Sequence, residues 1–322
     1  MRKNKSYIGV NLTHDSSVCQ VTNGKIDWFA EEERFSRVKH DSFPSLALLN
    51  MDINSIDNKL QISGLYEPHN KDKFKNDANS FCTQAVKKYT SEIAAGLVYK
   101  EVIQYEFYLQ HHDFHCACGF YNSGFPRAAV LVVDGMGNPL DDKDNMQEVE
   151  SIYTCGYPTI FKKHSINVTP TYIEADTMRL CFGIGMVYQA MSNYFGFGDF
   201  GSGKLMGLAS YGEEDPNIKS FIHDDGGTVI DLFYRSRFGV TFIPYDYVRY
   251  PNDVDEFIGI DSKDIKQRFA NLAYRVQKDF EKYMTTLILK TLDVTGEKNL
   301  VLTGGCALNC VANYEYLKHL PE

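Results

Sequence analysis

Apolar runs and alternating positions predict two groups of β-strands, one near the start of each half of the chain. The first is a three-strand meander whose last two strands are joined by Asn23-Gly24, a dipeptide typical of tight hairpins. The second group begins with a continuous apolar run, and a polar stretch at 139–147 separates this run from the next predicted strand. We expect strands at residues 7–11, 18–22 and 25–30 in the first group and at 128–133, 151–154 and 159–163 in the second.

Apolar residues spaced three and four positions apart predict helices between and after these strands. The candidate at 101–120 carries several histidines, and the one at 265–292 is the longest. A short buried strand at 299–302 precedes the last helix. The helices are expected at 77–99, 101–120, 184–194, 265–292 and 306–320.

The order strand, polar or glycine-containing turn, strand, strand occurs twice, although the residues themselves do not repeat. Two such meanders, each followed by helices, predict an α/β protein of the duplicated actin/hexokinase-like type, with two lobes around a nucleotide cleft. We place the lobes at residues 1–127 and 128–322.

Composition and charge narrow the function classes only slightly. The net charge of −9 argues against a protein that binds nucleic acid mainly by electrostatics. Neither a secretion signal nor an apolar run of the ~20 residues that span a membrane is visible. The eight cysteines are scattered and form no C-x-x-C pair, which is typical of reduced thiols. We therefore expect a cytoplasmic protein that does not act at a membrane.

A candidate metal site combines two histidines with a carboxylate. His111 and His115 stand four apart, so on a helix they share one face and can hold one metal ion. Asp134 ends the apolar run that opens the second strand group, with Gly135 and Gly137 directly behind it. The alternative is a polar helix start with exposed histidines. The adjacent Asp-Gly-Met-Gly turn favours the metal site, because imidazoles, a carboxylate and exposed amides together suit a metal-bound polyphosphate.

The segment from Gly198 to Lys204 has the G-x-x-x-x-G-K spacing of a phosphate-binding loop. However, Leu205 stands where a hydroxyl must reach magnesium, and the segment follows a predicted helix instead of a buried strand. We therefore do not expect a true P-loop. Lys204 can still contact a phosphate.

Gly304 and Gly305 follow the predicted strand at 299–302, and Asn309 and Asn313 come next at helical spacing. Glycines permit close approach to a base or ribose, and amide side chains can read their edges, so this segment can hold an adenosine. An ordinary strand-to-helix turn explains it equally well.

Two polar segments near the N-terminus are weaker candidates. His14-Asp15 lies in the first predicted turn, where the histidine can polarise or deprotonate a hydroxyl, although turn chemistry alone explains such a pair. Lys39 belongs to the charged run at 31–40, and a run of this kind is usually a solvated face.

Taken together and in this order, six motifs resemble those of the O-carbamoyltransferases, the family of the tobramycin, cephamycin and nodulation carbamoyltransferases. The resemblance runs from about residue 7 to the end. The motifs are Val10-Asn-Leu-Thr-His14-Asp15-Ser-Ser, Glu31-Glu-Glu-Arg-Phe-Ser-Arg-Val-Lys39-His40, His111-His-x-x-His115, Val133-Asp134-Gly-x-Gly, Gly203-Lys204-Leu-Met-Gly-Leu-Ala-Ser-Tyr-Gly212 and Gly304-Gly-Cys-Ala-Leu-Asn309-Cys-Val-Ala-Asn313.

The resemblance implies a fold and an activity. Members of the family join a domain similar to the tRNA threonylcarbamoyladenosine transferase to a C-terminal domain of the threonylcarbamoyl-AMP synthase type. The C-terminal domain makes carbamoyl adenylate from carbamoyl phosphate and ATP. The first domain binds the adenylate through a metal, commonly iron(II), with manganese or magnesium as alternatives. It then passes the carbamoyl group to a hydroxyl of a sugar, an antibiotic or another small molecule.

Carried over by motif, the resemblance also assigns roles to residues. His111, His115 and Asp134 would be metal ligands. His14, next to Asp15, would be a candidate base at the acceptor hydroxyl, and Lys39 would steady the carbamoyl or phosphate group. The nucleotide side would comprise Gly135, Gly137, Lys204, Gly304, Gly305, Asn309 and Asn313.

The family pattern continues beyond the last predicted helix with a Gly-Asp-x-Gly-Gly segment, whose aspartate supplies another metal ligand, and with the C-terminal domain. We therefore expect this chain to be a fragment, a cleaved product or a split subunit whose partner supplies the rest, and a homodimer is a further expected assembly. Two other interpretations stay open. One is a threonylcarbamoyl transferase acting on tRNA, which the acidic charge disfavours. The other is a catalytically inactive nucleotide-binding subunit. The sequence does not identify the acceptor.

Overall fold

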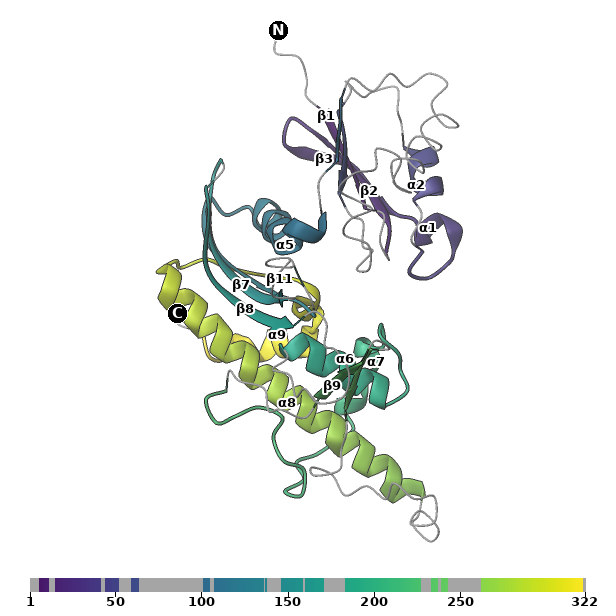
Figure 1. The fold of residues 1–322 in the computed structure, drawn as a ribbon, viewed down its shortest axis with the longest axis vertical. Coiled ribbons are helices and arrows are strands. Elements are labelled where there is room, and N and C mark those ends of the chain that lie inside the picture. Colours follow the sequence, from purple (N-terminus) through teal and green to yellow (C-terminus); the bar gives the residue numbers. More distant parts are fainter. Residues whose placement is uncertain are drawn as a thin grey trace. The chain divides into compact units, whose positions relative to one another are not determined.

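The computed structural model describes residues 6–11, 15–41, 44–51, 59–63, 101–104, 107–135, 137, 146–158, 160–170, 183–226, 233–236, 239–242 and 262–320 (Figure 1). The chain forms two compact units that divide after Gln110. The division falls earlier than the predicted lobe boundary at 127, because most of the histidine-bearing helix packs in the second unit. The helix expected at 77–99 lies outside the described residues.

The first unit is built on a five-stranded mixed sheet in the order β3-β2-β1-β4-β5. Strands β1, β2 and β3 form the predicted antiparallel meander, and β4 and β5 add parallel to β1. The hairpin residues Asn23 and Gly24 both have positive φ, as a tight hairpin turn requires. The elements are β1 (Ser6–Asn11), β2 (Ser17–Thr22), β3 (Lys25–Glu31), α1 (Glu33–Ser36), α2 (Ser45–Asn50), β4 (Lys59–Ser63) and β5 (Glu101–Gln104).

The second unit is built on a four-stranded sheet in the order β11-β6-β7-β8, with a separate β9–β10 ribbon. Here β6, β7 and β8 are antiparallel, and β11 adds parallel to β6. The elements are α5 (Phe107–Ser123), β6 (Arg127–Val133), β7 (Met146–Gly156), β8 (Ile160–Pro170), α6 (Ile184–Tyr194), α7 (Ser202–Ala209), β9 (Phe233–Ser236), β10 (Gly239–Phe242), α8 (Ser262–Thr295), β11 (Leu300–Thr303), the 3₁₀ turn η3 (Gly305–Leu308) and α9 (Cys310–Tyr316).

The two sheets share the order and the directions of four strands, β3-β2-β1-β4 in the first and β8-β7-β6-β11 in the second. In each, the first strand of the meander is central and is flanked by the second strand and by a parallel strand from later in the chain. The α/β class expected from the sequence is thus confirmed.

After the exposed Arg127, strand β6 is apolar and buried from Ala128 to Val133, and helices cover both of its faces. Leu131 and Val133 join a core formed largely by α6 and α8, whereas Val130 and Val132 pack with Cys116 and other residues of α5. In Figure 1, α8 runs along the second sheet. The strand is therefore fixed from both sides, and so is the position of the aspartate that follows it.

Two predicted helices differ from the structure. The segment expected as one helix at 101–120 begins with β5, because Val102 and Ile103 are β-branched and pair with β4; the helix itself starts at Phe107. The helix expected at 306–320 is divided by Asn309, whose backbone is not helical and whose side chain caps α9.

Within the described part of the chain, no helix has the length and apolar content that crossing a bilayer requires. The six cysteines described there are free thiols.

Candidate metal centre and nucleotide site

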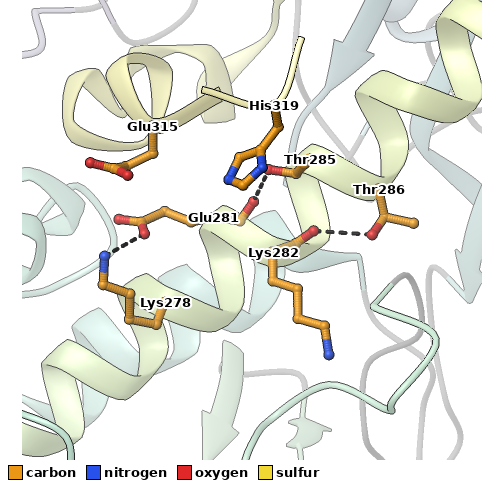
Figure 2. A pocket seen from close by; sticks show the side chains of 7 residues that line it. All are labelled: Lys278, Glu281, Lys282, Thr285, Thr286, Glu315 and His319. Atoms are coloured by element: carbon orange, nitrogen blue, oxygen red, sulfur yellow. Dashed lines mark hydrogen bonds and ion pairs between the residues drawn. The ribbon is translucent and has the colours of Figure 1, made fainter. Parts of the chain in front are cut away.

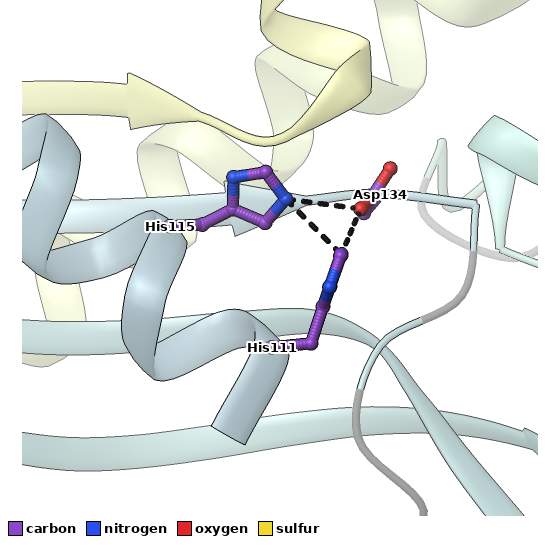
Figure 3. A group of neighbouring side chains, drawn as sticks. All are labelled: His111, His115 and Asp134. Atoms are coloured by element: carbon purple, nitrogen blue, oxygen red, sulfur yellow. Dashed lines mark hydrogen bonds and ion pairs between the residues drawn. The ribbon is translucent and has the colours of Figure 1, made fainter. Parts of the chain in front are cut away.

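Three predicted ligand residues meet at the end of β6. His111 and His115 lie one turn apart on α5, and Asp134 directly follows β6. Figure 3 shows their side chains pointing toward one another. Nε2 of His111 lies 2.7 Å and Nε2 of His115 3.2 Å from Oδ2 of Asp134, and the two nitrogens are 3.1 Å apart. The structure therefore brings together residues that are separated by 23 and 19 positions in the sequence.

The donor set fits a divalent metal. One ligand atom from each of the three side chains lies within 4.8 Å of the others, and all three residues are partly buried. Two imidazole nitrogens and one carboxylate oxygen are ligands common to iron, manganese and zinc sites. The residues present are therefore able to hold a metal ion and leave further coordination positions open.

The carboxylate of Asp134 is oriented by the backbone. Its Oδ1 accepts hydrogen bonds from the amides of Gly135 at 2.8 Å and Gly305 at 3.3 Å, so Oδ2 is the oxygen that faces the histidines. Burial favours the protonated acid, but hydrogen bonds and charge from His111 and His115 more than offset it. They hold the pKa of Asp134 well below its usual range, so the group is a carboxylate.

The glycines after β11 are required by close packing against this aspartate. Gly304 has a φ of 92°, and a Cβ there would meet the carbonyl oxygen of Val133. A Cβ on Gly305 would lie 2.8 Å from Oδ1 of Asp134, and one on Gly185 would lie 2.8 Å from its backbone oxygen. The sequence suggested close approach to a ligand; in the structure these glycines lie close to Val133 and Asp134.

Asn309 is a structural partner within the second unit. It is 8% exposed, and its Oδ1 accepts from the amide of Ala312 at 3.0 Å, which caps α9. Its Nδ2 donates to Oε1 of Gln277 at 2.9 Å, and Gln277 Nε2 lies 3.2 Å from Asn309 Oδ1. The hydroxyl of Tyr188 donates to the same Gln277 oxygen at 2.7 Å. Asn309 thus holds the turn after Gly305, and its contact with a nucleotide stays a prediction.

The side chain of Asn313 makes fewer hydrogen bonds than that of Asn309. Its Nδ2 donates to the carbonyl of Ala307 at 2.8 Å, whereas its buried Oδ1 has no hydrogen-bond partner among the described residues. A buried acceptor without a partner is costly, so this atom is a candidate for contact with a bound molecule. The predicted adenosine contact at Asn313 is also untested.

Lys204 lies on α7 and is exposed. The segment before it joins α6 to α7, and Leu205 is fully buried in the core. The G-x-x-x-x-G-K spacing therefore stands in a helix–turn–helix, which agrees with the expectation that it is not a P-loop. Contact between Lys204 and a phosphate stays a prediction.

A buried polar network behind the metal centre was not predicted. The carboxylate of Glu148 on β7 is 2% exposed; its Oε1 accepts from Lys163 at 2.7 Å and its Oε2 lies 3.3 Å from Nδ1 of His112. The hydroxyl of Ser151 lies 2.7 Å from the same His112 nitrogen. Burial lowers the pKa of His112 to about 3 and raises that of Glu148, so His112 is neutral. Because His112 follows His111, these contacts tie the ligand-bearing part of α5 to β7.

Gly137 belongs to the same region. Its amide donates to the carbonyl of Glu148 at 2.6 Å, and a Cβ on Gly137 would overlap the His112 ring. The sequence analysis did not find this network, because Glu148 lies before the strand predicted at 151–154, whereas β7 begins at Met146. Without the strand register, Glu148 could not be paired with Lys163 on β8.

The acceptor-side candidates belong to the first unit. His14 lies outside the described residues. Lys39 is exposed in the turn after α1, and Oδ1 of Asp15 lies 2.7 Å from Nδ1 of His40. His40 closes both the charged run and one of the six family motifs, but no role was predicted for it.

A separate cavity of about 380 Å³ lies along α8, beside the C-terminal end of the chain (Figure 2). It shares no residue with the metal centre. In the cavity wall Lys278 donates to Glu281 at 2.7 Å, whereas Glu315 pairs with Lys318, which does not line the cavity. The lining residues are Lys278, Glu281, Lys282, Thr285, Thr286, Glu315 and His319.

Comparison with known proteins identifies the family. The family model described as "Carbamoyltransferase N-terminus" matches residues 66–320. The chain therefore belongs to this family, and the predicted resemblance is confirmed.

The relatives are distant and longer. Nodulation protein NolNO of Sinorhizobium fredii is 24% identical over 327 residues, which cover 95% of this chain and 42% of the relative. The uncharacterized protein sll1178 of Synechocystis is 26% identical over 340 residues, covering 95% and 51%. Nodulation protein NolO of Bradyrhizobium diazoefficiens is 25% identical over 214 residues, covering 65% and 33%. The chain thus spans about half or less of the length of these relatives.

Among solved structures, full-length HypF in its phosphate- and nucleotide-bound form aligns with a TM-score of 0.47 and 12% identity. The alignment covers 99% of this chain and 51% of HypF.

Proposed function

We propose that the protein transfers a carbamoyl group from carbamoyl adenylate to a hydroxyl of a small-molecule or sugar acceptor. The observation that carries this proposal is the convergence of His111, His115 and Asp134 in a chain of the carbamoyltransferase family. Carbamoyl phosphate and ATP are the proposed sources of the donor. The chain spans only part of its relatives, so the donor-forming step belongs to the proposal for the whole protein.

In this proposal His111, His115 and Asp134 hold a divalent metal, with iron(II) as the expected ion. Such an ion would neutralise negative charge on the phosphate of the donor. The chain's own residues prepare the site: the amides of Gly135 and Gly305 fix the carboxylate of Asp134, and the contacts of His112 with Ser151 and Glu148 hold α5 against β7. This pre-formed geometry supports binding of a charged group without rearrangement of the ligands.

The residues proposed to bind the nucleotide are assigned from the family motifs and from their closeness to Asp134. We propose that Gly304, Gly305, Asn309 and Asn313 hold the adenosine and that Lys204 contacts phosphate. The rigid turn after β11 supports this assignment, because it places Gly305 against Asp134.

We further infer that the two units are the lobes of a duplicated actin-like domain. The shared order and directions of four strands in the two sheets support this inference. The long connections that separate the parallel strands from the meanders are typical of such folds.

A transfer assay tests the proposal without knowledge of the natural acceptor. The protein is incubated with synthetic carbamoyl adenylate, manganese(II) and glycerol as a polyhydroxyl probe, and AMP and O-carbamoyl glycerol are measured by mass spectrometry. We expect metal-dependent formation of carbamoyl glycerol by the wild type and its loss in Asp134→Asn. A matched variant elsewhere on the second sheet, His164→Ala, is expected to retain it. Release of AMP at the uncatalysed rate in the wild type would contradict the proposal.

A further inference from the structure

The glycine-rich turn between α6 and α7 is fixed by side chains of α6. Gly198 has a φ of 80°, which lets the chain turn sharply, and its carbonyl accepts from the hydroxyl of Ser192 at 2.8 Å. Oδ1 of Asp199 accepts hydrogen bonds from Nδ2 of Asn193 at 2.7 Å and from Nε2 of Gln189 at 3.2 Å. The turn therefore holds a carboxylate in a defined position.

Asp199 is exposed, and its two partners leave one carboxylate oxygen available. Both amide groups donate to Oδ1, and no residue in the described part of the chain donates to Oδ2. Because the partners of Oδ1 restrict the orientation of the side chain, Oδ2 is preorganised to accept hydrogen bonds from a bound molecule.

The same turn adjoins the metal-ligand candidates. Gly135 directly follows Asp134 and donates its amide to Oδ1 of that residue at 2.8 Å. A Cβ on Gly135 would lie 4.0 Å from Oε1 of Gln189, whose Nε2 donates to Asp199. One glutamine side chain thus extends from the loop of the candidate metal centre to the carboxylate of the turn, and all of these residues belong to the second unit.

The chemistry of this carboxylate favours hydroxyl groups as its ligands. A carboxylate accepts hydrogen bonds from hydroxyls but repels a phosphate. In dinucleotide-binding folds an acidic side chain binds a ribose hydroxyl in this way. The ribose of a nucleotide is joined to the phosphate that the metal would hold, and a sugar acceptor has to reach the carbamoyl group on that same phosphate. Neighbouring sugar hydroxyls are therefore expected on this side of the metal centre.

We propose that Asp199, in the turn between α6 and α7, binds neighbouring hydroxyls of a sugar ring next to the metal centre. This inference rests on the proposed carbamoyl transfer. The ribose of the nucleotide and a sugar acceptor present the same chemistry to the carboxylate, and two measurements distinguish them.

Asp199→Asn replaces the available oxygen and keeps the hydrogen bonds of the turn. The asparagine oxygen can still accept from Gln189 and Asn193, whereas an amide group takes the place of Oδ2. Asp215→Asn is the matched control, because Oδ1 of Asp215 also accepts two hydrogen bonds, from the backbone and the side chain of Asn217, in a loop of the same unit.

The first measurement tests the ribose. Calorimetric titration in the presence of manganese(II) compares ATP with dideoxy-ATP, which lacks both ribose hydroxyls. If the ribose is the ligand, we expect Asp199→Asn to weaken ATP binding about 10-fold or more, and binding of dideoxy-ATP to stay within about twofold of the wild type. A role of Asp199 in the structure of the turn alone would affect both nucleotides equally.

The second measurement tests the acceptor. The protein is incubated with synthetic carbamoyl adenylate, manganese(II) and either glucose, which carries neighbouring hydroxyls, or ethanol, which carries a single hydroxyl. If the acceptor is the ligand, we expect Asp199→Asn to lower carbamoylation of glucose about 10-fold or more relative to carbamoylation of ethanol, with ATP binding unchanged.

Asp215→Asn is expected to match the wild type in both measurements. The inference would be overturned if Asp199→Asn changed neither the preference for ATP over dideoxy-ATP nor the preference for glucose over ethanol. Asp199 would then serve only to hold the turn. A wild type that neither binds ATP with manganese nor transfers the carbamoyl group would overturn the proposed function, and this inference with it.

Discussion

The backbone amide of Gly305 lies 3.3 Å from Oδ1 of Asp134, although 171 positions separate the two residues in the sequence. The contact exists because β11 pairs in parallel with β6 and both strands end at the same edge of the sheet. Asp134 follows β6 and Gly304-Gly305 follows β11, so the sheet itself brings the metal-ligand candidate and the adenosine candidate together.

The first prediction concerns the glycine that permits this contact. Gly304→Ala is expected to destabilise the protein by roughly 2–4 kcal/mol, because a Cβ there meets the Val133 carbonyl at an unfavourable φ. Gly296→Ala is the control: Gly296 also has positive φ but no atom lies near its Cβ position, so about 1 kcal/mol is expected. Urea unfolding measures the loss of unfolding free energy in both variants. Equal losses would show that Gly304 does not lie as close to the Val133 carbonyl as the structure indicates.

Much of this arrangement could be predicted from local sequence. The i, i+4 spacing of His111 and His115 and the apolar run that ends at Asp134 are short-range signals, and the structure joins them as expected. The tight hairpin at Asn23-Gly24 is of the same kind. The periodicity of α6 and α8 was read correctly because both helices bury a broad apolar stripe.

Other features depend on contacts that sequence periodicity does not contain. Strand β5 was predicted as part of a helix. Its pairing with β4 stabilises it as a strand, and the sequence does not show that pairing. The hydrogen bonds of Asn309 with Gln277 could not be predicted, because the sequence does not show that α8 lies alongside the turn. The pair of Asp15 and His40 is likewise formed between turns distant in sequence.

The second prediction separates the two asparagines. Asn309→Ala removes a helix cap and the two hydrogen bonds between Asn309 and the buried Gln277, so a loss of roughly 2 kcal/mol or more in unfolding free energy is expected. Asn313→Ala removes a single hydrogen bond to Ala307 and is expected to cost under about 1 kcal/mol. Thermal or urea unfolding compares them. A greater loss in Asn313→Ala would reverse the roles assigned here.

The third prediction concerns the buried pair behind the metal centre. Lys163→Met leaves the carboxylate of Glu148 buried without its cation and is expected to cost about 3–5 kcal/mol. Lys163→Met combined with Glu148→Gln is expected to recover part of this loss. The exposed pair of Lys318 and Glu315, 2.6 Å apart, provides the control, and Lys318→Met is expected to lower the unfolding free energy far less than Lys163→Met does. A cost for Lys163→Met no larger than this control would mean that Glu148 is reached by water.

The central claim is that His111, His115 and Asp134 form a metal site that binds the phosphate of a nucleotide. Calorimetric titration of ATP into the protein, with and without manganese(II), tests it most directly. Three proteins are compared: the wild type, His111→Ala/His115→Ala, and the control His164→Ala/His223→Ala, which also removes two histidines. The account predicts binding that requires manganese, disappears in the first double variant and persists in the control. Binding that is equally tight without manganese, and unchanged by loss of His111 and His115, would contradict it.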